Sequence, residues 1–165
     1  MLAIDGQSGA GKSTLAQALA QRLSAPVVSL EDLYGGWDGL EDGIERLRSA
    51  VLEPLAQGRG ASVPRYDWHR GQWAAPWELE PPAELVLEGV GAGAGALAPY
   101  LSLLVWLELD PDARRGRALA REDGELYGPQ WARWEAQEDA YMTRERPRER
   151  ADFVLSVSTH EDLGR

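Results

Sequence analysis

Eight residues near the beginning of the chain follow the pattern G-x-x-x-x-G-K-[ST]: Gly6-Gln7-Ser8-Gly9-Ala10-Gly11-Lys12-Ser13. The short apolar run before them, residues 1–5, predicts a buried strand, and residues 14–23 predict a helix. A strand, a glycine-rich loop and a helix in this order make a phosphate-binding loop, because backbone N–H groups and the helix N-terminus surround the anion. The motif therefore predicts an α/β fold with a phosphate site after its first strand.

Lys12 and Ser13 have separate expected roles in this loop. Lys12 is the only lysine among the 17 lysine and arginine residues, and it stands where a flexible point charge must reach the outer phosphates. The hydroxyl of Ser13 is expected to bind Mg²⁺. Residues Gly6 to Thr14 are together expected to bind a triphosphate, with a chance glycine-rich turn as the alternative.

Composition limits the classes of protein to which the chain can belong. With 165 residues, it is expected to form one domain over residues 1–165, and no apolar stretch approaches the roughly 20 residues of a membrane span. The net charge of −10 argues against a nucleic-acid partner, because phosphate backbones attract basic surfaces. No cysteine is present and the chain opens on its first strand rather than a leader, so a cytoplasmic protein is expected.

Strands and helices alternate along the rest of the chain. Further strands are expected at 26–30, 84–88, 103–109 and 151–156, and helices at 40–55, 111–122 and 130–144. This alternation predicts a parallel sheet covered on both faces. Residues 58–82 are rich in proline, glycine and tryptophan, which predicts a long, largely irregular excursion with short strands at most, of the kind that is usually functional.

Acidic residues follow two predicted strands at their carboxyl ends, where open α/β sheets bind ligands. Glu31 and Asp32 follow the strand at 26–30, and a carboxylate there can accept a proton from an attacking hydroxyl or hold metal-bound water. Glu88 ends the strand at 84–88 and is expected to meet Mg²⁺, directly or through water. The alternatives are a helix cap or a solvated acid for the first pair, and a solvent-exposed strand end for Glu88.

Arginines are spaced regularly on the helix expected at 111–122. Arg114, Arg117 and Arg121 share one helical face, and guanidinium groups suit phosphate oxygens, so a phosphate-facing lid is expected. The alternative is a solvated face paired with nearby acids. A second basic cluster alternates with Glu145 and Glu149, so local salt bridges are an equally good interpretation there; it consists of Arg144, Arg146, Arg148 and Arg150.

Aromatic residues gather in the segment Arg65-Tyr66-Asp67-Trp68-His69-Arg70, which Trp73 and Trp77 follow. Aromatic rings can stack on a planar acceptor, and Asp67 can bind hydroxyls. The alternative is that these rings hold a long loop against the body of the protein.

Taken in order, these motifs resemble the uridine kinase and phosphoribulokinase-like group of P-loop kinases, within the nucleoside monophosphate kinase fold. The resemblance covers nearly the whole chain and rests on Gly6–Ser13, Glu31-Asp32-Leu33-Tyr34, Tyr66-Asp67, Leu85-Val86-Leu87-Glu88-Gly89, Asp110-Pro111 with its spaced arginines, and the closing Ala151-Asp152 strand. It implies a three-layer fold whose five parallel strands lie in the order 2-3-1-4-5, with helices on both faces. It also implies ATP with Mg²⁺ as donor and a small molecule with a hydroxyl group as acceptor.

The chain departs from this group at two places that bear on the acceptor. Uridine kinases carry an acid in an Asp-x-Phe-Tyr pattern as catalytic base; Glu31 falls at that position here and Asp32 follows, so both stay candidates. Uridine kinases also carry Tyr-Asp-His-Pro in the acceptor loop, where this chain has Tyr-Asp-Trp-His. The acceptor is therefore a nucleoside or a similar metabolite, and uridine itself is in doubt.

The expected reaction assigns a role to each group. Lys12, Arg117 and Arg121 would act on the transferred phosphoryl group, a short lid would span about 117–130, and the acceptor would meet Tyr34, Arg65, Tyr66 and Asp67. Two other functions stay open. A kinase acting on a nucleoside monophosphate would need a second anion site, for which Arg65 and Arg70 are candidates. A nucleotide-binding module without transfer would have Glu31 and Asp32 both pointing away from the phosphates, with no cavity between.

Overall fold

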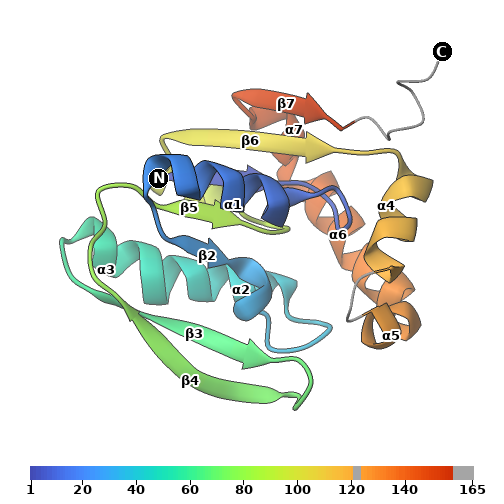
Figure 1. Ribbon diagram of the computed structural model, residues 1–165, viewed down its shortest axis with the longest axis horizontal. Coiled ribbons are helices and arrows are strands. Elements are labelled where there is room, and N and C mark those ends of the chain that lie inside the picture. The colour runs from blue at the N-terminus through green and yellow to red at the C-terminus, as the bar shows by residue number, and fades with distance from the viewer. Residues whose placement is uncertain (121–123, 158–165) are drawn as a thin grey trace.

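The computed structural model describes residues 1–120 and 124–157, and its centre is a five-stranded parallel sheet (Figure 1). The strands are β1 (Leu2–Asp5), β2 (Val27–Ser29), β5 (Val86–Glu88), β6 (Leu103–Glu108) and β7 (Phe153–Ser156). They lie in the order β2-β5-β1-β6-β7, so the 2-3-1-4-5 order implied by the resemblance is confirmed. Ile4 pairs with Glu88 on one side and Val105 on the other, which brings the ends of β1 and β5 to the same edge of the sheet.

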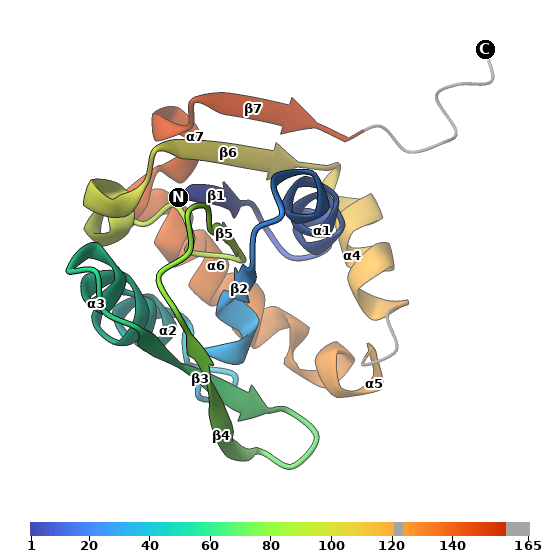
Figure 2. The ribbon, with the colours of Figure 1, turned by 60° about the vertical axis from the view of Figure 1, so that its left-hand side comes forward.

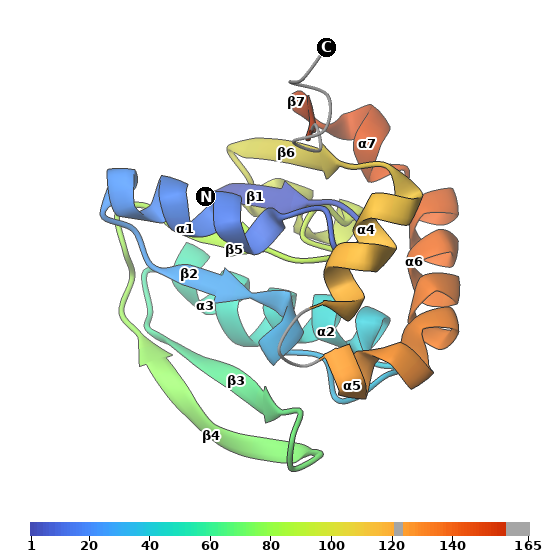
Figure 3. The ribbon, with the colours of Figure 1, turned by 45° about the vertical axis from the view of Figure 1, so that its right-hand side comes forward.

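Alternate side chains of the sheet are buried in two separate cores, because successive residues of a strand point to opposite faces. On one face, Ile4 and Val105 pack with Ala16 and Ala20 of α1 (Lys12–Leu23). On the other face, Ala3 and the side chains beside it pack against the helices from residues 40–56 and against α6 (Trp131–Glu145). The sheet therefore lies between two helical layers, as predicted (Figures 2 and 3).

The helix expected at 40–55 forms as three consecutive parts. α2 (Leu40–Arg46) and α3 (Glu53–Ala56) are joined by a π-helical stretch, η2 (Leu47–Leu52). Pro54 has no N–H to donate to a carbonyl of the preceding turn, and the wider π turn before it accommodates this loss.

Residues 61–79 form a regular β-hairpin, so the prediction of a largely irregular excursion is wrong. β3 (Ala61–Asp67) and β4 (Gln72–Leu79) are antiparallel, with a register shift between Val63 and Arg65, at Pro64. Ala61 and Val63 are buried while Ser62 is exposed, which is the alternation of a half-buried strand. The prolines and tryptophans concealed this alternation, because Pro64 sits at the bulge and two tryptophans, Trp73 and Trp77, lie on β4.

The second half of the chain supplies the remaining helical segments. They are η3 (Gly95–Tyr100), α4 (Pro111–Leu119), α5 (Gly124–Tyr127), η4 (Gly128–Gln130), α6 and α7 (Pro147–Arg150), preceded in the chain by the 3₁₀ turn η1 (Leu30–Asp32). Asp110 caps α4 by accepting hydrogen bonds from the N–H groups of Asp112 and Ala113, and α4 ends at Leu119, three residues before the predicted end. In the described part of the chain, no helix combines the length and apolar character that a membrane crossing requires.

Candidate active site

The phosphate-binding loop joins β1 to α1 and is packed tightly by its neighbours. At Gly9, φ is +82° and a Cβ would overlap the carbonyl oxygen of Arg114 in α4. At Gly6, φ is +149° and a Cβ would overlap the carbonyl oxygen of Leu107 at the end of β6. Only glycine fits at either position. The loop therefore lies in close contact with the end of β6 and with α4.

A cavity of about 330 Å³, here called the phosphate cavity, opens over this loop. It is lined by Gly9, Gly11, Lys12, Ser13, Thr14, Glu31 and Arg117. The N–H groups in the first turn of α1 have no partner within the helix, so they are available to an anion here. Lys12 is buried, and its Nζ donates a hydrogen bond of 3.1 Å to the carbonyl oxygen of Gln7. The cavity thus brings together the predicted loop, one of the two candidate bases and one of the predicted arginines.

Ser13, which lines this cavity, contacts Glu88 at the end of β5. Ser13 Oγ donates to Glu88 Oε2 at 3.2 Å, and Ser29 Oγ donates to Glu88 Oε1 at 2.6 Å. Burial raises the pKa of Glu88 above its usual value. Among the described residues, no group of three or more histidine, cysteine, aspartate or glutamate side chains could hold a metal. A hydroxyl and a carboxylate fit Mg²⁺, which is bound by one or two protein oxygens together with substrate phosphates and water.

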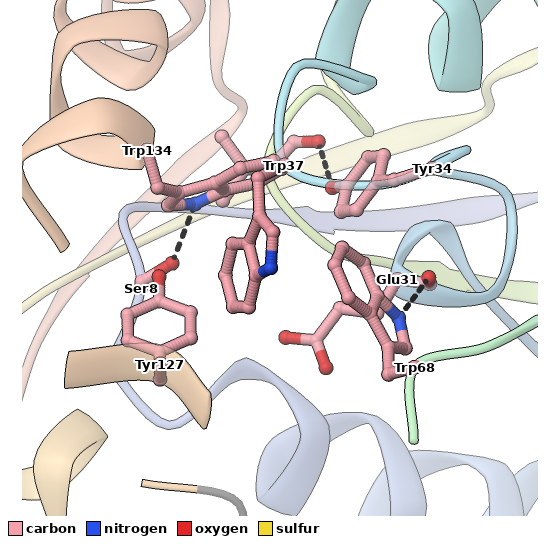
Figure 4. A pocket seen from close by; sticks show the side chains of 8 residues that line it. Ser8, Glu31, Tyr34, Trp37, Trp68, Tyr127 and Trp134 are labelled. Carbon is pink, nitrogen blue, oxygen red and sulfur yellow. Dashed lines mark hydrogen bonds between the residues drawn. The ribbon is translucent and has the colours of Figure 1, made fainter. Parts of the chain in front are cut away.

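A second, narrow cavity of about 40 Å³, here called the aromatic pocket, lies beside the loop (Figure 4). It is lined by Ser8, Glu31, Tyr34, Trp37, Trp68, Val90, Tyr127 and Trp134. The ring centroids of Trp37 and Trp68 are 4.7 Å apart, and those of Tyr34 and Trp134 are 4.8 Å apart. The residues come from the loop, from the segment after β2, from the hairpin and from α5 and α6 (Figure 4).

Three of these aromatic side chains, Tyr34, Trp68 and Trp134, donate hydrogen bonds to the protein. Tyr34 donates from its hydroxyl to the carbonyl oxygen of Val90 at 2.7 Å, and burial raises its pKa well above the usual value. The indole N–H of Trp68 donates to the carbonyl oxygen of Glu31 at 3.0 Å, and that of Trp134 donates to Ser8 Oγ at 3.1 Å. These three side chains therefore offer ring surfaces to a ligand rather than hydrogen-bond donors.

Glu31 lines both cavities, whereas Asp32 lines neither. Both acids belong to η1, which Ser29 caps by accepting a hydrogen bond of 3.3 Å at Oγ from the N–H of Glu31. The Glu31 carboxylate is directed towards the space among Trp37, Trp68 and Tyr127 (Figure 4). The pKa of Asp32 is raised, first by burial and then by the neighbouring charge of Glu31. Of the two acids, Glu31 is the one at the junction of the two cavities.

The other residues predicted to contact an acceptor lie outside the lining of both cavities, with Tyr34 as the exception. Arg65, Tyr66 and Asp67 are on β3. The ring of Tyr66 packs 5.2 Å from the centroid of Trp68, and Asp67 accepts a hydrogen bond from the N–H of Arg70 in the hairpin turn. Tyr66 supports Trp68 and Asp67 supports the turn, and a direct contact of Arg65, Tyr66 or Asp67 with an acceptor stays a prediction.

The arginines of α4 do not all face the phosphate cavity. Arg117 lines it, whereas Arg114 is buried and donates from Nη1 to the carbonyl oxygen of Ser8 at 3.2 Å. The prediction that the three arginines face the phosphates together is therefore wrong for Arg114. Arg121 lies outside the described residues. In the second basic cluster, the local salt-bridge interpretation holds for Arg144 and Arg150, which pair with Glu145, and for Arg146, which pairs with Glu149. Arg148 pairs instead with Glu108 at the end of β6.

Sequence reasoning missed Trp37, Tyr127, Trp134 and the buried Glu138. Trp37 stands in a glycine-rich loop, which indicated a turn and nothing more. Trp134 and Glu138 are four residues apart on a predicted helix, so they share a face, and a glutamate on an otherwise apolar face was the available signal.

The comparisons with known proteins agree with this geometry. No protein-family model matches the chain. A possible uridine kinase from Bacillus stearothermophilus superposes with a TM-score of 0.65 and 24% identity, over 93% of this chain and 86% of that one. A proposed fructose transport system kinase from Silicibacter sp. TM1040 gives 0.60 and 22%, over 93% and 88%.

One curated protein also matches the chain in part. The bifunctional pantoate ligase/cytidylate kinase of Gloeobacter violaceus is 38% identical over 82 residues, which are 44% of this chain and 16% of that protein. The chain thus corresponds to a small part of this relative. Its fold is that of the P-loop kinases, with the five-stranded parallel sheet between helical layers that its structural neighbours share.

Proposed function

We propose that this chain is an ATP-dependent small-molecule kinase that transfers the γ-phosphoryl group of Mg·ATP to a hydroxyl of an unphosphorylated acceptor with a flat ring, such as a nucleoside. The observation that carries this proposal is the position of Glu31, which lines both the phosphate cavity and the aromatic pocket. An acid at that junction can reach an acceptor hydroxyl while the donor phosphates lie beside it.

On the donor side, the loop from Gly6 to Thr14 would bind the triphosphate through its N–H groups and the N-terminus of α1. Lys12 would leave the carbonyl of Gln7 and neutralise the outer phosphates, and Arg117 would add a second positive charge from α4. Ser13 and Glu88 would hold Mg²⁺, which neutralises charge on the phosphate oxygens when bound. Phosphoryl transfer needs this positioning and neutralisation more than covalent chemistry.

On the acceptor side, Trp37 and Trp68, which contact each other, would form an aromatic wall against which a flat ring packs. Glu31 would accept the proton of the attacking hydroxyl at its carboxylate. The surrounding rings would also exclude water, which lowers hydrolysis of the donor.

A kinase acting on a monophosphate is the nearest rival, and the partial match to a cytidylate kinase fusion favours it. Such a reaction needs a cation at the acceptor's phosphate. Among the described residues that line the aromatic pocket, none is arginine or lysine. This favours an unphosphorylated acceptor.

A module that binds nucleotide without transferring phosphate is the second rival. It is disfavoured because Glu31 faces a cavity that also contains Lys12 and Ser13, whereas the rival expects both acids to point away.

The test is turnover of ATP with Mg²⁺ against matched panels of nucleosides, nucleoside monophosphates and sugars. We expect a nucleoside to stimulate ADP formation and the Lys12→Ala variant to lose ATP binding. Stimulation by monophosphates alone would favour the first rival. ATP binding without stimulation by any acceptor would favour the second, and unchanged ATP binding in Lys12→Ala would contradict the proposed donor site.

A further inference from the structure

Glu138 of α6 is a buried acid that the proposed transfer does not use, and it holds the phosphate-binding loop directly. Its side chain is 1% exposed. Its Oε1 accepts hydrogen bonds from the N–H of Ser8 at 2.9 Å and from Ser8 Oγ at 2.5 Å. The indole N–H of Trp134 donates to the same oxygen at 2.8 Å. One carboxylate oxygen therefore fixes both the backbone and the side chain of a residue 130 positions away.

Arg114 of α4 holds the other side of the same residue. Its Nη1 donates to the carbonyl oxygen of Ser8 at 3.2 Å and lies 4.0 Å from Glu138 Oε2. Ser8 is thus held at its N–H by an acid and at its carbonyl by a base. The next residue, Gly9, lies directly against the backbone of Arg114. We call Glu138, Arg114 and Ser8 the Ser8 clamp.

The Ser8 clamp buries two charged side chains, which costs solvation free energy. Glu138 Oε2 and Arg114 Nε are buried and have no hydrogen-bond partner within the residues that the structure describes. Burial also raises the pKa of Glu138. Apolar side chains of similar volume would fill the same buried space with less loss of solvation. A buried charged pair whose hydrogen bonds are incomplete therefore indicates that the pair serves a defined geometry.

The N–H groups of the loop are divided between the protein and the phosphate cavity. Gly6 donates its N–H to Asp5 and Ser8 donates its N–H to Glu138, so the first half of the loop is bonded to the protein. Gly9, Gly11 and the first turn of α1 line the phosphate cavity. Fixing Ser8 sets the direction of the peptides that follow it, and preformed donors bind an anion without the entropy loss of ordering a loop.

We propose that Glu138 is a positioning residue for the donor, holding Ser8 so that the second half of the loop is preformed for the phosphates of Mg·ATP. The inference rests on the proposed function in that it takes Mg·ATP as the ligand of the loop. Trp134 extends the same contact to the aromatic pocket, since it bonds to Ser8 and Glu138 and packs on Tyr34.

The test separates loop geometry from general stability. The dissociation constant of Mg·ATP is measured by calorimetry for wild type, Glu138→Ala, Glu138→Gln and Asp139→Ala, each well below its own Tm. We expect Glu138→Ala to bind about tenfold more weakly, because a charged hydrogen-bond acceptor of the loop is lost. Glu138→Gln retains an acceptor oxygen of the same reach and is expected to stay within about threefold. Asp139 is the exposed neighbour on the same helix, and its variant should bind as wild type does.

Two results would overturn the inference. One is wild-type affinity in Glu138→Ala. The other is an equal loss of affinity in Glu138→Ala and Glu138→Gln that follows their loss of Tm, as expected for a residue that only supports the fold. If wild type binds Mg·ATP but transfers phosphate to no acceptor, the proposed kinase function fails while the result for Glu138 stands. If wild type does not bind Mg·ATP, both fail.

Discussion

Ser13 donates a hydrogen bond of 3.2 Å to one oxygen of Glu88, which joins the first turn of α1 to the end of β5. Ser29 holds the other oxygen at 2.6 Å. The carboxylate is therefore oriented by two hydroxyl groups from different elements, one of which belongs to the phosphate-binding motif. Such an orientation would leave little to rearrange on binding of Mg²⁺ by these two residues, as proposed.

Glu88→Gln is expected to weaken the use of Mg²⁺, because the variant keeps the shape of the side chain and loses its charge. We expect the Mg²⁺ concentration for half-maximal ATP turnover to rise about tenfold or more, in the range seen when oriented metal-site groups are lost. The measurement is turnover against free Mg²⁺ at saturating ATP. Glu84→Gln is the control, since Glu84 is exposed just before β5. An unaltered Mg²⁺ dependence in Glu88→Gln would remove this residue from the metal site.

Glu31→Gln is expected to lower the rate of phosphoryl transfer without lowering donor affinity. Loss of a general base reduces kcat by about 10²–10⁴-fold, while the loop and Lys12 still bind ATP. Asp32→Asn should keep most of the activity, because Asp32 lines neither cavity. Transfer rates at saturating acceptor, together with the ATP dissociation constant of each variant, distinguish the two acids. If Asp32→Asn is the inactive variant, the roles are reversed.

The contribution of Asp32 to the free energy of unfolding is expected to fall as the pH rises. Its pKa is raised above the ordinary aspartate value of 3.8, chiefly by burial and then by the charge of Glu31. The folded state therefore holds this proton more tightly than the unfolded state, and the contribution of Asp32 to stability falls as the pH rises from below 3.8 through the raised value. Asparagine resembles the protonated form. At the lowest pH of this range, we expect Asp32→Asn and wild type to have the same Tm. As the pH rises, the Tm of the variant should exceed that of wild type by a difference that increases and then levels off. Thermal melts across that range check the sign, and a margin that shrinks with rising pH would refute it.

Trp68→Ala is expected to raise the KM for the acceptor and to leave the KM for ATP unchanged. Stacking of a base on an aromatic side chain contributes about 1–3 kcal/mol, so the acceptor KM should rise by roughly tenfold. Trp73→Ala is the matched control, because Trp73 is on the same hairpin, is 43% exposed and lies outside the lining of the aromatic pocket. Equal effects of the two variants would mean that the hairpin, rather than the pocket wall, determines acceptor binding.

Most of the donor side could be predicted from the sequence because its physics is local. The loop needs glycines, one lysine and one serine at fixed spacing, all within residues 6–13. The places of Glu31 and Glu88 at strand ends follow from the topology of a parallel sheet, and the strand order is the one that the family resemblance implied. Arg114 shows the limit of periodicity, since a helical face predicts which side chains lie together but not whether they meet a ligand or the protein.

The acceptor side could not be predicted because its residues meet only in the folded chain. Trp37, Trp68 and Trp134 are separated by 31 or more positions, and no local pattern relates them. The hairpin that carries Trp68 was hidden by the proline at its bulge. Glu138 reaches Ser8 across 130 positions, a contact that only the packing of α6 on the loop creates.

Because several indole rings are grouped in the aromatic pocket, the intrinsic fluorescence of the protein is expected to respond to binding there. Three of the seven tryptophans line that cavity, with Trp37 only 4.7 Å from Trp68 and 6.5 Å from Trp134 between ring centroids. A molecule that enters among them changes the polarity around several emitting rings at once. Intrinsic fluorescence can therefore follow candidate acceptors in unlabelled protein, without a coupled reaction and before any turnover has been observed.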